Sequence, residues 1–512
     1  MKSSDNLYQL IQALTKAEKR NFKIIAAQHS KKDSSNYILL FDAIERQKTY
    51  DEARLKKKFR NYPFAKNISK TKHLLYHLIL KTLRSLNESR TTRSKLSALL
   101  EDAQTLTDKS LIDQAYAVLV KAARLAKSNE LYPNLLNILD RQLQLLPLSS
   151  QSAITGKLRE LVVQRQSVAA IVNTEIQYKS LLSLIQLSFP HSGGKASLAQ
   201  QHVLSTVLDD PLLQSEQEPK SFLTKIFSVE IQALACEARD AFTEAVAHWQ
   251  KARLLWLQHE EMIALFPDDY LRNTAAYLIC SLNARQKDLD YERVLNELRN
   301  QLPQNGQKAQ RNLFFTTTLD FIGKLSTKQL EDCTALLQDL EAGLEEHTVH
   351  LNIYWRIDLC YHIGIYHFLQ ADYRKALQWM DRIQQFDASD ICAHVQYFCR
   401  LIGLMALYEL KEFDTLKDDI QHMLQTLHGR KSTKVEQLIL DSVKQLLYAN
   451  HNRETRSIFS ELQLSLTNWE ANDIPIQLVT SNAIQHWVDH QLSDDDRYQT
   501  FELNPKRLDF SS

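Results

Sequence analysis

The sequence predicts an all-α fold. Its 512 residues include only 9 Gly and 10 Pro, whereas average usage would give about 36 and 26. Glycine supplies the positive φ angles of hairpin turns and tight βα turns, so its scarcity argues against a rich β architecture. Apolar residues recur at helical spacing nearly everywhere. Hydrophobic residues make up 44% of the chain, enough for an extensive core.

Charge divides the chain into two parts. Residues 1–95 contain 22 Lys and Arg against 8 Asp and Glu, and the remainder contains 40 against 53. Such asymmetry indicates a module that faces a polyanion, joined to a different body. We therefore expect a basic all-α module over residues 1–95.

Four helices are predicted within this module. Residues 15–18 (Thr-Lys-Ala-Glu) form a plausible capping box that opens the first. The second spans 36–47, and Asp51-Glu52 begins the third, with acid at the positive helix end. Pro63 breaks the chain before a long fourth helix, over about 67–86.

The fourth helix carries a basic stripe. At 100° per residue, one narrow arc holds Lys66, Lys70, His73, His77, Lys81 and Arg84, and the opposite face is apolar. The preceding helix adds Lys56, Lys57, Lys58 and Arg60. This succession is compatible with a helix-turn-helix variant whose recognition helix is 67–86, with Lys and Arg neutralising phosphates. The region also resembles the N-terminal part of bacterial proteins of unknown function that join it to helical repeats, a resemblance that supplies no function.

Three interpretations of the basic stripe stay open. The first is a nucleic-acid surface. The second is a surface for an acidic protein partner, or for the acidic remainder of the same chain. The third is a solvated cationic face, which is what most charge runs are. The loop over 61–66 is longer than the tight turn of a simple helix-turn-helix, and no β-wing is evident.

Beyond the module, proline punctuates a run of helical hairpins. Residues 188–220 hold three prolines and the pair Gly193-Gly194, which marks an interruption that contains a short helix over 202–208. The predicted segments are helical hairpins over 96–187, the interruption over 188–220, repeats over 221–450, and C-terminal capping helices with a polar tail over 451–512.

The repeats carry a family resemblance. Ile363-Gly364-x-x-His367 precedes Ala376-x-x-x-Met380, with the turn expected at 371–373. A large-small pair that faces a small residue on the partner helix is similar to the tetratricopeptide pattern, because small residues let two backbones approach closely. Further windows contain Ala233, Ala245, Trp249, Ala252 and Gly403.

The pattern also departs from that family. Cys360 and Cys399 stand where it prefers Trp, and Gly364 and Gly403 are 39 residues apart instead of about 34. The resemblance implies a tetratricopeptide-like α-solenoid that binds a peptide or a protein. An ordinary irregular α-helical domain is the alternative.

Signatures of common chemistry are missing from the sequence. It contains no G-x-x-x-x-G-K-[ST], G-x-G-x-x-G or G-x-S-x-G. His73 and His77 have i,i+4 spacing, but no Glu follows His73 and lysines flank the pair. Asp358-x-Cys360-x-His362 recurs at residues 390–394, but i and i+2 point about 200° apart on a helix. We expect no metal and no cofactor, and buried cysteines that act as core residues.

These observations favour a non-enzymatic adaptor that binds a protein or peptide through its repeats, with a cationic module that contacts a polyanion. The alternative is a nucleic-acid-binding regulator of transcription or RNA whose repeats sense a partner or dimerise. An enzyme with an unrecognised site is a third reading. None of the six cysteines forms C-x-x-C, the N-terminus reads as an amphipathic helix, and no apolar span of about 18 residues exists. We therefore expect a cytoplasmic protein without a membrane span.

Overall fold

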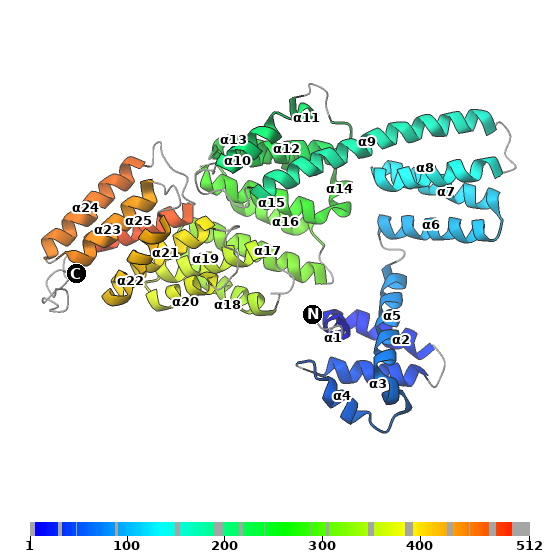
Figure 1. The fold of residues 1–512 in the computed structure, drawn as a ribbon, viewed down its shortest axis with the longest axis horizontal. Helices are drawn as coiled ribbons and strands as arrows, with labels where there is room; N and C mark the ends of the chain where they lie inside the picture. The colour runs from blue at the N-terminus through cyan, green and yellow to red at the C-terminus, as the bar shows by residue number, and fades with distance from the viewer. Residues whose placement is uncertain are drawn as a thin grey trace. The chain divides into compact units, whose positions relative to one another are not determined.

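The computed structural model describes most of the chain, and every regular element in the described part is a helix (Figure 1). The described ranges are 6–28, 33–47, 49–87, 91–148, 154–188, 198–214, 219–239, 241–286, 288–303, 307–346, 353–384, 393–427, 434–449, 451–469 and 478–493. They contain no strand, as the glycine content predicts. None of the described helices combines the length and the apolarity needed to cross a bilayer.

The helices follow one another with short connections. The first part contains α1 (Asn6–Ala13), α2 (Lys16–Gln28), α3 (Asp33–Glu45), α4 (Glu52–Lys58), the 3-10 turn η1 (Pro63–Asn67), α5 (Ile68–Asn87), α6 (Thr92–Asp108), α7 (Ile112–Ser128), α8 (Tyr132–Leu145), the 3-10 turn η2 (Leu146–Leu148) and α9 (Ile154–Ser188). The interruption predicted over 188–220 contains α10 (Leu198–Leu208) and α11 (Pro211–Gln214).

The remaining helices pack largely against their sequence neighbours. They are α12 (Phe222–Glu237), α13 (Phe242–Gln258), α14 (Glu260–Leu265), α15 (Pro267–Asn283), α16 (Tyr291–Gln301), α17 (Gln307–Ser326), α18 (Leu330–Glu346), α19 (Ile353–Leu369), α20 (Tyr373–Gln384), α21 (Ala393–Glu409), α22 (Phe413–Leu427), α23 (Lys434–Tyr448), α24 (Asn452–Trp469) and α25 (Leu478–Ser493). The chain divides into two compact units, residues 1–173 with 303–310 and residues 174–302 with 311–512.

Local signals set the boundaries of the N-terminal helices. The capping box is confirmed, because the Thr15 backbone N–H donates to Glu18 at 2.8 Å and the Glu18 N–H donates to the Thr15 hydroxyl at 3.3 Å. Asp51 caps α4 by accepting from the Arg54 N–H at 2.9 Å. Pro63 opens η1, so α5 begins at Ile68, one residue after the predicted start.

One turn geometry joins successive helices in both units. At 371 the backbone takes the left-handed conformation (φ 56°), the Asp372 N–H donates to the His367 carbonyl at 2.9 Å, and the Ala371 N–H donates to the Phe368 carbonyl at 3.0 Å. These two bonds are a Schellman motif, which satisfies the last carbonyls of α19. The same pair of bonds, with positive φ, recurs at Ser110, Glu130, Arg285, Lys328 and Lys411.

The turns mark out the hairpins α15–α16, α17–α18, α19–α20 and α21–α22. The donors that close them lie at 286, 329, 372 and 412, and the equivalent bond of α12–α13 is donated at 241. Successive donors are therefore 40 to 45 residues apart, more than the roughly 34 residues of a tetratricopeptide unit. The structure shows sequential helix pairs of longer and variable period.

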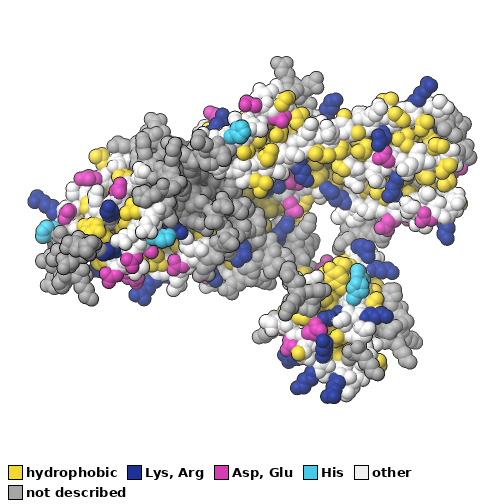
Figure 2. Space-filling model, viewed as in Figure 1, with side chains coloured by type: hydrophobic (Ala, Val, Ile, Leu, Met, Phe, Trp, Pro, Cys, Tyr) yellow, Lys and Arg dark blue, Asp and Glu magenta, His cyan; other side chains and the backbone are white. Residues whose placement is uncertain are grey.

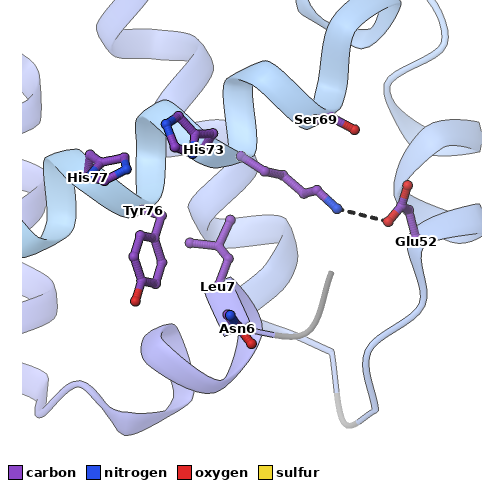
Figure 3. Close-up of a pocket in the computed structure, with 8 residues that line it drawn as sticks. Asn6, Leu7, Glu52, Ser69, His73, Tyr76 and His77 are labelled. Atoms are coloured by element: carbon purple, nitrogen blue, oxygen red, sulfur yellow. Dashed lines mark hydrogen bonds and ion pairs between the residues drawn. The ribbon is translucent and has the colours of Figure 1, made fainter. Parts of the chain in front are cut away.

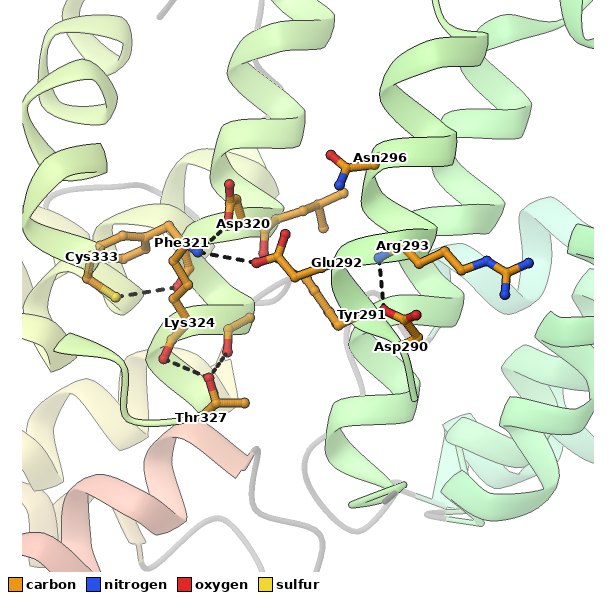
Figure 4. Close-up of polar contacts among 12 residues, drawn as sticks. Asp290, Tyr291, Glu292, Arg293, Asn296, Asp320, Phe321, Lys324, Thr327 and Cys333 are labelled. Carbon is orange, nitrogen blue, oxygen red and sulfur yellow. Dashed lines mark hydrogen bonds and ion pairs between the residues drawn. The ribbon is translucent and has the colours of Figure 1, made fainter. Parts of the chain in front are cut away.

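Glycine permits close helix approach between two successive hairpins. A Cβ on Gly323 of α17 would lie 2.5 Å from the Tyr291 ring of α16. That ring is fixed, because its hydroxyl donates to the Leu319 carbonyl at 2.6 Å (Figure 4). Lys324 lies 3.2 Å from Glu292 and 3.4 Å from Asp320, so charge pairing accompanies the close contact. The α16–α17 interface is thus fixed by shape and by polar bonds.

Candidate functional site

The predicted basic stripe lies on the exposed face of α5. On the inner face of this helix, Leu75 and Ile79 are fully buried. The opposite side exposes Lys70, His73, His77, Lys81 and Arg84. At 1.5 Å per residue, the stripe from Lys70 to Arg84 is about 21 Å long. Dark blue side chains outnumber magenta ones on the helices of this module (Figure 2). The side chain of Lys66 lies outside the described part.

The acidic side chains that the structure describes in this module have partners outside the stripe. Five acidic side chains are described between residues 6 and 87, and each of them caps a helix or pairs with a lysine. Glu18 is in the capping box, Asp51 caps α4, Asp42 lies 2.8 Å from Lys23, Glu45 lies 3.2 Å from Lys19, and Glu52 lies 2.9 Å from Lys56 and 2.8 Å from Lys72. No ion pair is observed between a described acid and the stripe.

The four cations predicted here, Lys56, Lys57 and Lys58 at the end of α4 and Arg60 just after it, fall into two groups. Lys57, Lys58 and Arg60 are exposed, as a polyanion surface requires. Lys56, also predicted for that surface, is paired with Glu52 one helical turn earlier. Its charge is therefore already partly compensated within α4.

Beside the stripe lies a cavity of about 450 Å³ between α1, α4 and α5 (Figure 3). It is lined by Asn6, Leu7, Glu52, Ser69, Lys72, His73, Tyr76 and His77. Among these residues, Lys72 is buried and the two histidine rings stack edge to face with centroids 4.3 Å apart. Polar hydrogen-bonding groups therefore border the stripe on the side of this cavity.

Lys72 is a structural cation and not part of the stripe. Burial alone would lower its pKa, but hydrogen bonds to Glu52 at 2.8 Å and to the Tyr50 hydroxyl at 2.9 Å outweigh that effect and raise it. Hydrogen bonds from Lys56 and Lys72 lower the pKa of Glu52 to about 2. These bonds fix α4 against α5, and both the Glu52 carboxylate and the Lys72 ammonium group stay charged.

In the first occurrence of the cysteine and histidine pattern, Cys360 and His362 belong to the core. Cys360 is buried, and burial raises the pKa of its thiol to about 11. The His362 Nδ1 bonds the Asp358 carbonyl oxygen one turn back, at 2.7 Å. Asp390 and Cys392 lie outside the described ranges, as does the His394 side chain. Within the described residues, no group of three or more His, Cys, Asp or Glu could hold a metal.

The predicted repeat-packing residues lie at helix interfaces. Ala233, Ala245, Trp249 and Ala252 of α12 and α13 are buried, and so is Ala376 of α20. A Cβ on Gly364 would lie 2.6 Å from the Met380 methyl group, so α19 and α20 approach closely there. Gly403 differs, because its nearest neighbour would be Leu377 at an ordinary 3.7 Å. An added Cβ would therefore force the Met380 side chain to move at Gly364 but would meet only ordinary contacts at Gly403.

A second candidate surface was not predicted from the sequence. Helix α25 bonds to the first helix of four consecutive hairpins. The Leu478 N–H donates to Asn283 of α15 at 3.2 Å, and Asn482 donates to the Ser326 carbonyl of α17 at 2.7 Å. The hydroxyls of Thr480 and Tyr361 of α19 lie 2.6 Å apart. Trp487 and Gln491 both donate to Glu409 of α21 at 2.7 Å. We call the surface formed by α15, α17, α19 and α21 the α25 seat.

Apolar burial accompanies these bonds. Val479, Ala483, Ile484, Trp487 and Val488 of α25 are at most 3% exposed and belong to the same core cluster as α19 and α21. A cavity of about 80 Å³ remains beneath the first turn of α25, between α15, α17 and α19. The α25 seat therefore holds an amphipathic helix by an apolar stripe and by polar bonds at its edges.

Comparison with known proteins gives no assignment. No protein-family model matches the chain, and no curated protein matches it. The class that the structure defines is an all-helical protein built from sequential helix pairs.

Proposed function

We propose that the chain is a non-enzymatic interaction protein, a degenerate tetratricopeptide-like α-solenoid that binds a protein partner and whose cationic N-terminal module contacts a polyanion. The recurring Schellman turns and the close approach at Gly364 support the solenoid. The longer period of 40 to 45 residues makes the tetratricopeptide units degenerate.

The observation that carries the protein-binding function is the α25 seat. In it, the first helices of four hairpins jointly receive a helix that lies far from them in the sequence. Binding an amphipathic helix in an apolar surface is a recurrent mode of peptide recognition. The partner segment is therefore an amphipathic helix with the pattern of α25, in which apolar residues at helical spacing are bordered by amide and hydroxyl side chains.

The test keeps all the described helices of the chain present. A protease site is introduced within 471–477, and the chain is cut after folding, so that α25 is held by non-covalent contacts alone. A labelled peptide of residues 478–493 is then added, and its fluorescence anisotropy is recorded. We expect saturable binding as the peptide exchanges with the resident helix.

Two variants of this peptide test whether the α25 seat binds it specifically. Trp487→Ala removes a fully buried side chain and the bond to Glu409, so it should bind at least about 100-fold more weakly. Ser493→Ala alters an exposed position and should bind like the parent peptide. A cut chain that stays folded but takes up no peptide would show that the α25 seat is fixed core and not a binding surface.

A further inference from the structure

Within the described part of the module, no carboxylate pairs with the exposed cations of α5. Other cations there meet carboxylates: Lys19 and Lys23 with Glu45, and Lys56 and Lys72 with Glu52. Lys70, Lys81 and Arg84 meet no described acid, and all three are exposed. Concentrated charge of one sign creates a surface potential that attracts an oppositely charged partner.

The stripe has the form of a linear array. Lys70, His73, His77, Lys81 and Arg84 fall within about 80° of arc and follow one another every 4.5 to 6 Å along the axis, at about 100° and 1.5 Å per residue. Duplex DNA is also a linear array, with one negative charge per about 1.7 Å of its axis. An α-helix with its side chains is about 10–12 Å wide, which matches the roughly 12 Å major groove of B-form DNA.

Other polyanions fit the α5 face less well. Protein interfaces depend on buried aromatic and aliphatic anchors, and Leu74 is the one exposed large apolar residue among the described side chains of α5. Single-stranded nucleic acid needs aromatic platforms on which its bases stack, and the partly buried Tyr76 is the one Phe, Tyr or Trp on this helix. The major groove of duplex RNA is too narrow for side chains to enter.

We propose that the exposed face of α5 is a binding site for double-stranded DNA. Lys70, Lys81 and Arg84 neutralise backbone phosphates, and Ser69 and His73, at the edge of the 450 Å³ cavity, supply hydrogen bonds to the backbone or to base edges. This inference rests on the proposed polyanion contact and names its partner. It is independent of the α25 seat.

The experiment measures binding of a fluorescent duplex DNA of about 24 base pairs to the full chain at about 50 to 300 mM salt. The variant is Lys70→Gln, Lys81→Gln and Arg84→Gln combined. Because each phosphate contact contributes about 0.9 to the slope of log K against log salt, we expect the magnitude of the slope to fall by about 2.7. The dissociation constant at low salt should rise at least about tenfold.

A matched variant separates local contacts from net charge. Lys121→Gln, Arg124→Gln and Lys127→Gln remove the same charge from exposed positions of α7 and should leave the slope unchanged. Equal slopes for the parent chain and the α5 variant, or equal losses for both variants, would overturn the assignment to α5. Circular dichroism melting of both variants checks that they are folded.

Other probes separate this inference from the proposed function. Labelled duplex RNA, single-stranded DNA, heparin and poly-glutamate are each titrated directly with the full chain and with the α5 variant. If heparin or poly-glutamate binds through the stripe and duplex DNA does not, the polyanion contact stands and the DNA site is wrong. If none of these probes binds, the polyanion contact falls as well.

Discussion

Three buried glycines face different neighbours, so an added methyl group would disturb the packing at some of these positions more than at others. Gly323 faces the fixed ring of Tyr291, and Gly364 faces the end of the flexible Met380 side chain. At Gly403 an added Cβ would lie at an ordinary van der Waals distance from its nearest neighbour. The same residue type therefore carries three different constraints. The cost of an added methyl group depends on whether the neighbour can move.

Alanine at these positions should give three outcomes. Gly323→Ala should lower the free energy of unfolding by about 1–3 kcal/mol, because the Tyr291 ring is held by its bond to Leu319. Gly403→Ala should raise it by about 0.5–1 kcal/mol, because alanine has the better helix propensity. The effect of Gly364→Ala on the free energy of unfolding should lie between these two. Urea unfolding measures all three, and equal effects would contradict the geometry.

One histidine on α25 links stability to pH. Burial lowers the pKa of His486, and the nearby His490 and Lys328 lower it further, while Asp489 opposes them. In the unfolded chain the pKa is near 6.5, so on acidification the unfolded state takes up the proton first. Stability from the neutral ring is therefore complete above about pH 6.5 and is lost as the pH falls below that value.

The melting temperature should accordingly fall between about pH 7 and pH 5, and His486→Gln should flatten part of that fall. Burial also lowers the pKa of His248 and His367, so some pH dependence should remain in the variant. Calorimetric scans at a series of pH values provide the measurement. Superimposable profiles for the parent chain and the variant would exclude His486 as a contributor.

Among the helices, α25 provides the clearest mutational test. Trp487→Ala removes a side chain that is 1% exposed and leaves Glu409 without one of its donors, so it should cost about 3–5 kcal/mol. Leu464→Ser on α24 changes a side chain that is 66% exposed and should cost less than about 0.5 kcal/mol. Thermal unfolding compares the two. A similar small loss for both would mean that α25 contributes little to the fold.

The helices were predictable to the extent that their signals are local. Asp51 marked the start of α4, and the helix predicted to begin at 67, after Pro63, begins at Ile68, because caps and proline act on their own turn. The face of α5 followed from the helical period. The pairing of Lys72 with Glu52 and Tyr50 joins segments about 20 residues apart and left no trace in the periodicity.

The α25 seat could not be predicted from the sequence, because it too depends on contacts between distant segments. Its bond between Leu478 and Asn283 spans 195 residues, and no propensity or spacing within α25 names the helices that receive it. The sequence predicted C-terminal capping helices over 451–512. The structure places α25 across the first helices of four hairpins, and residues 494–512 lie outside the described part.

The helix pairs mostly contact their neighbours in the sequence, so a chain of this kind is expected to unfold locally, one pair at a time. Helix α25 interrupts that locality. It joins α15, α17, α19 and α21 through one continuous element, so disturbance of one of these pairs is felt by the others.

This arrangement has a consequence for biosynthesis. The ribosome makes α25 after every hairpin that it joins, so the apolar surface of the α25 seat emerges before the helix that covers it. While the nascent chain grows, that surface is open to chaperones and to neighbouring chains on the same messenger. Arrival of α25 then closes it, and maturation of this half of the protein becomes a single late event instead of a gradual one.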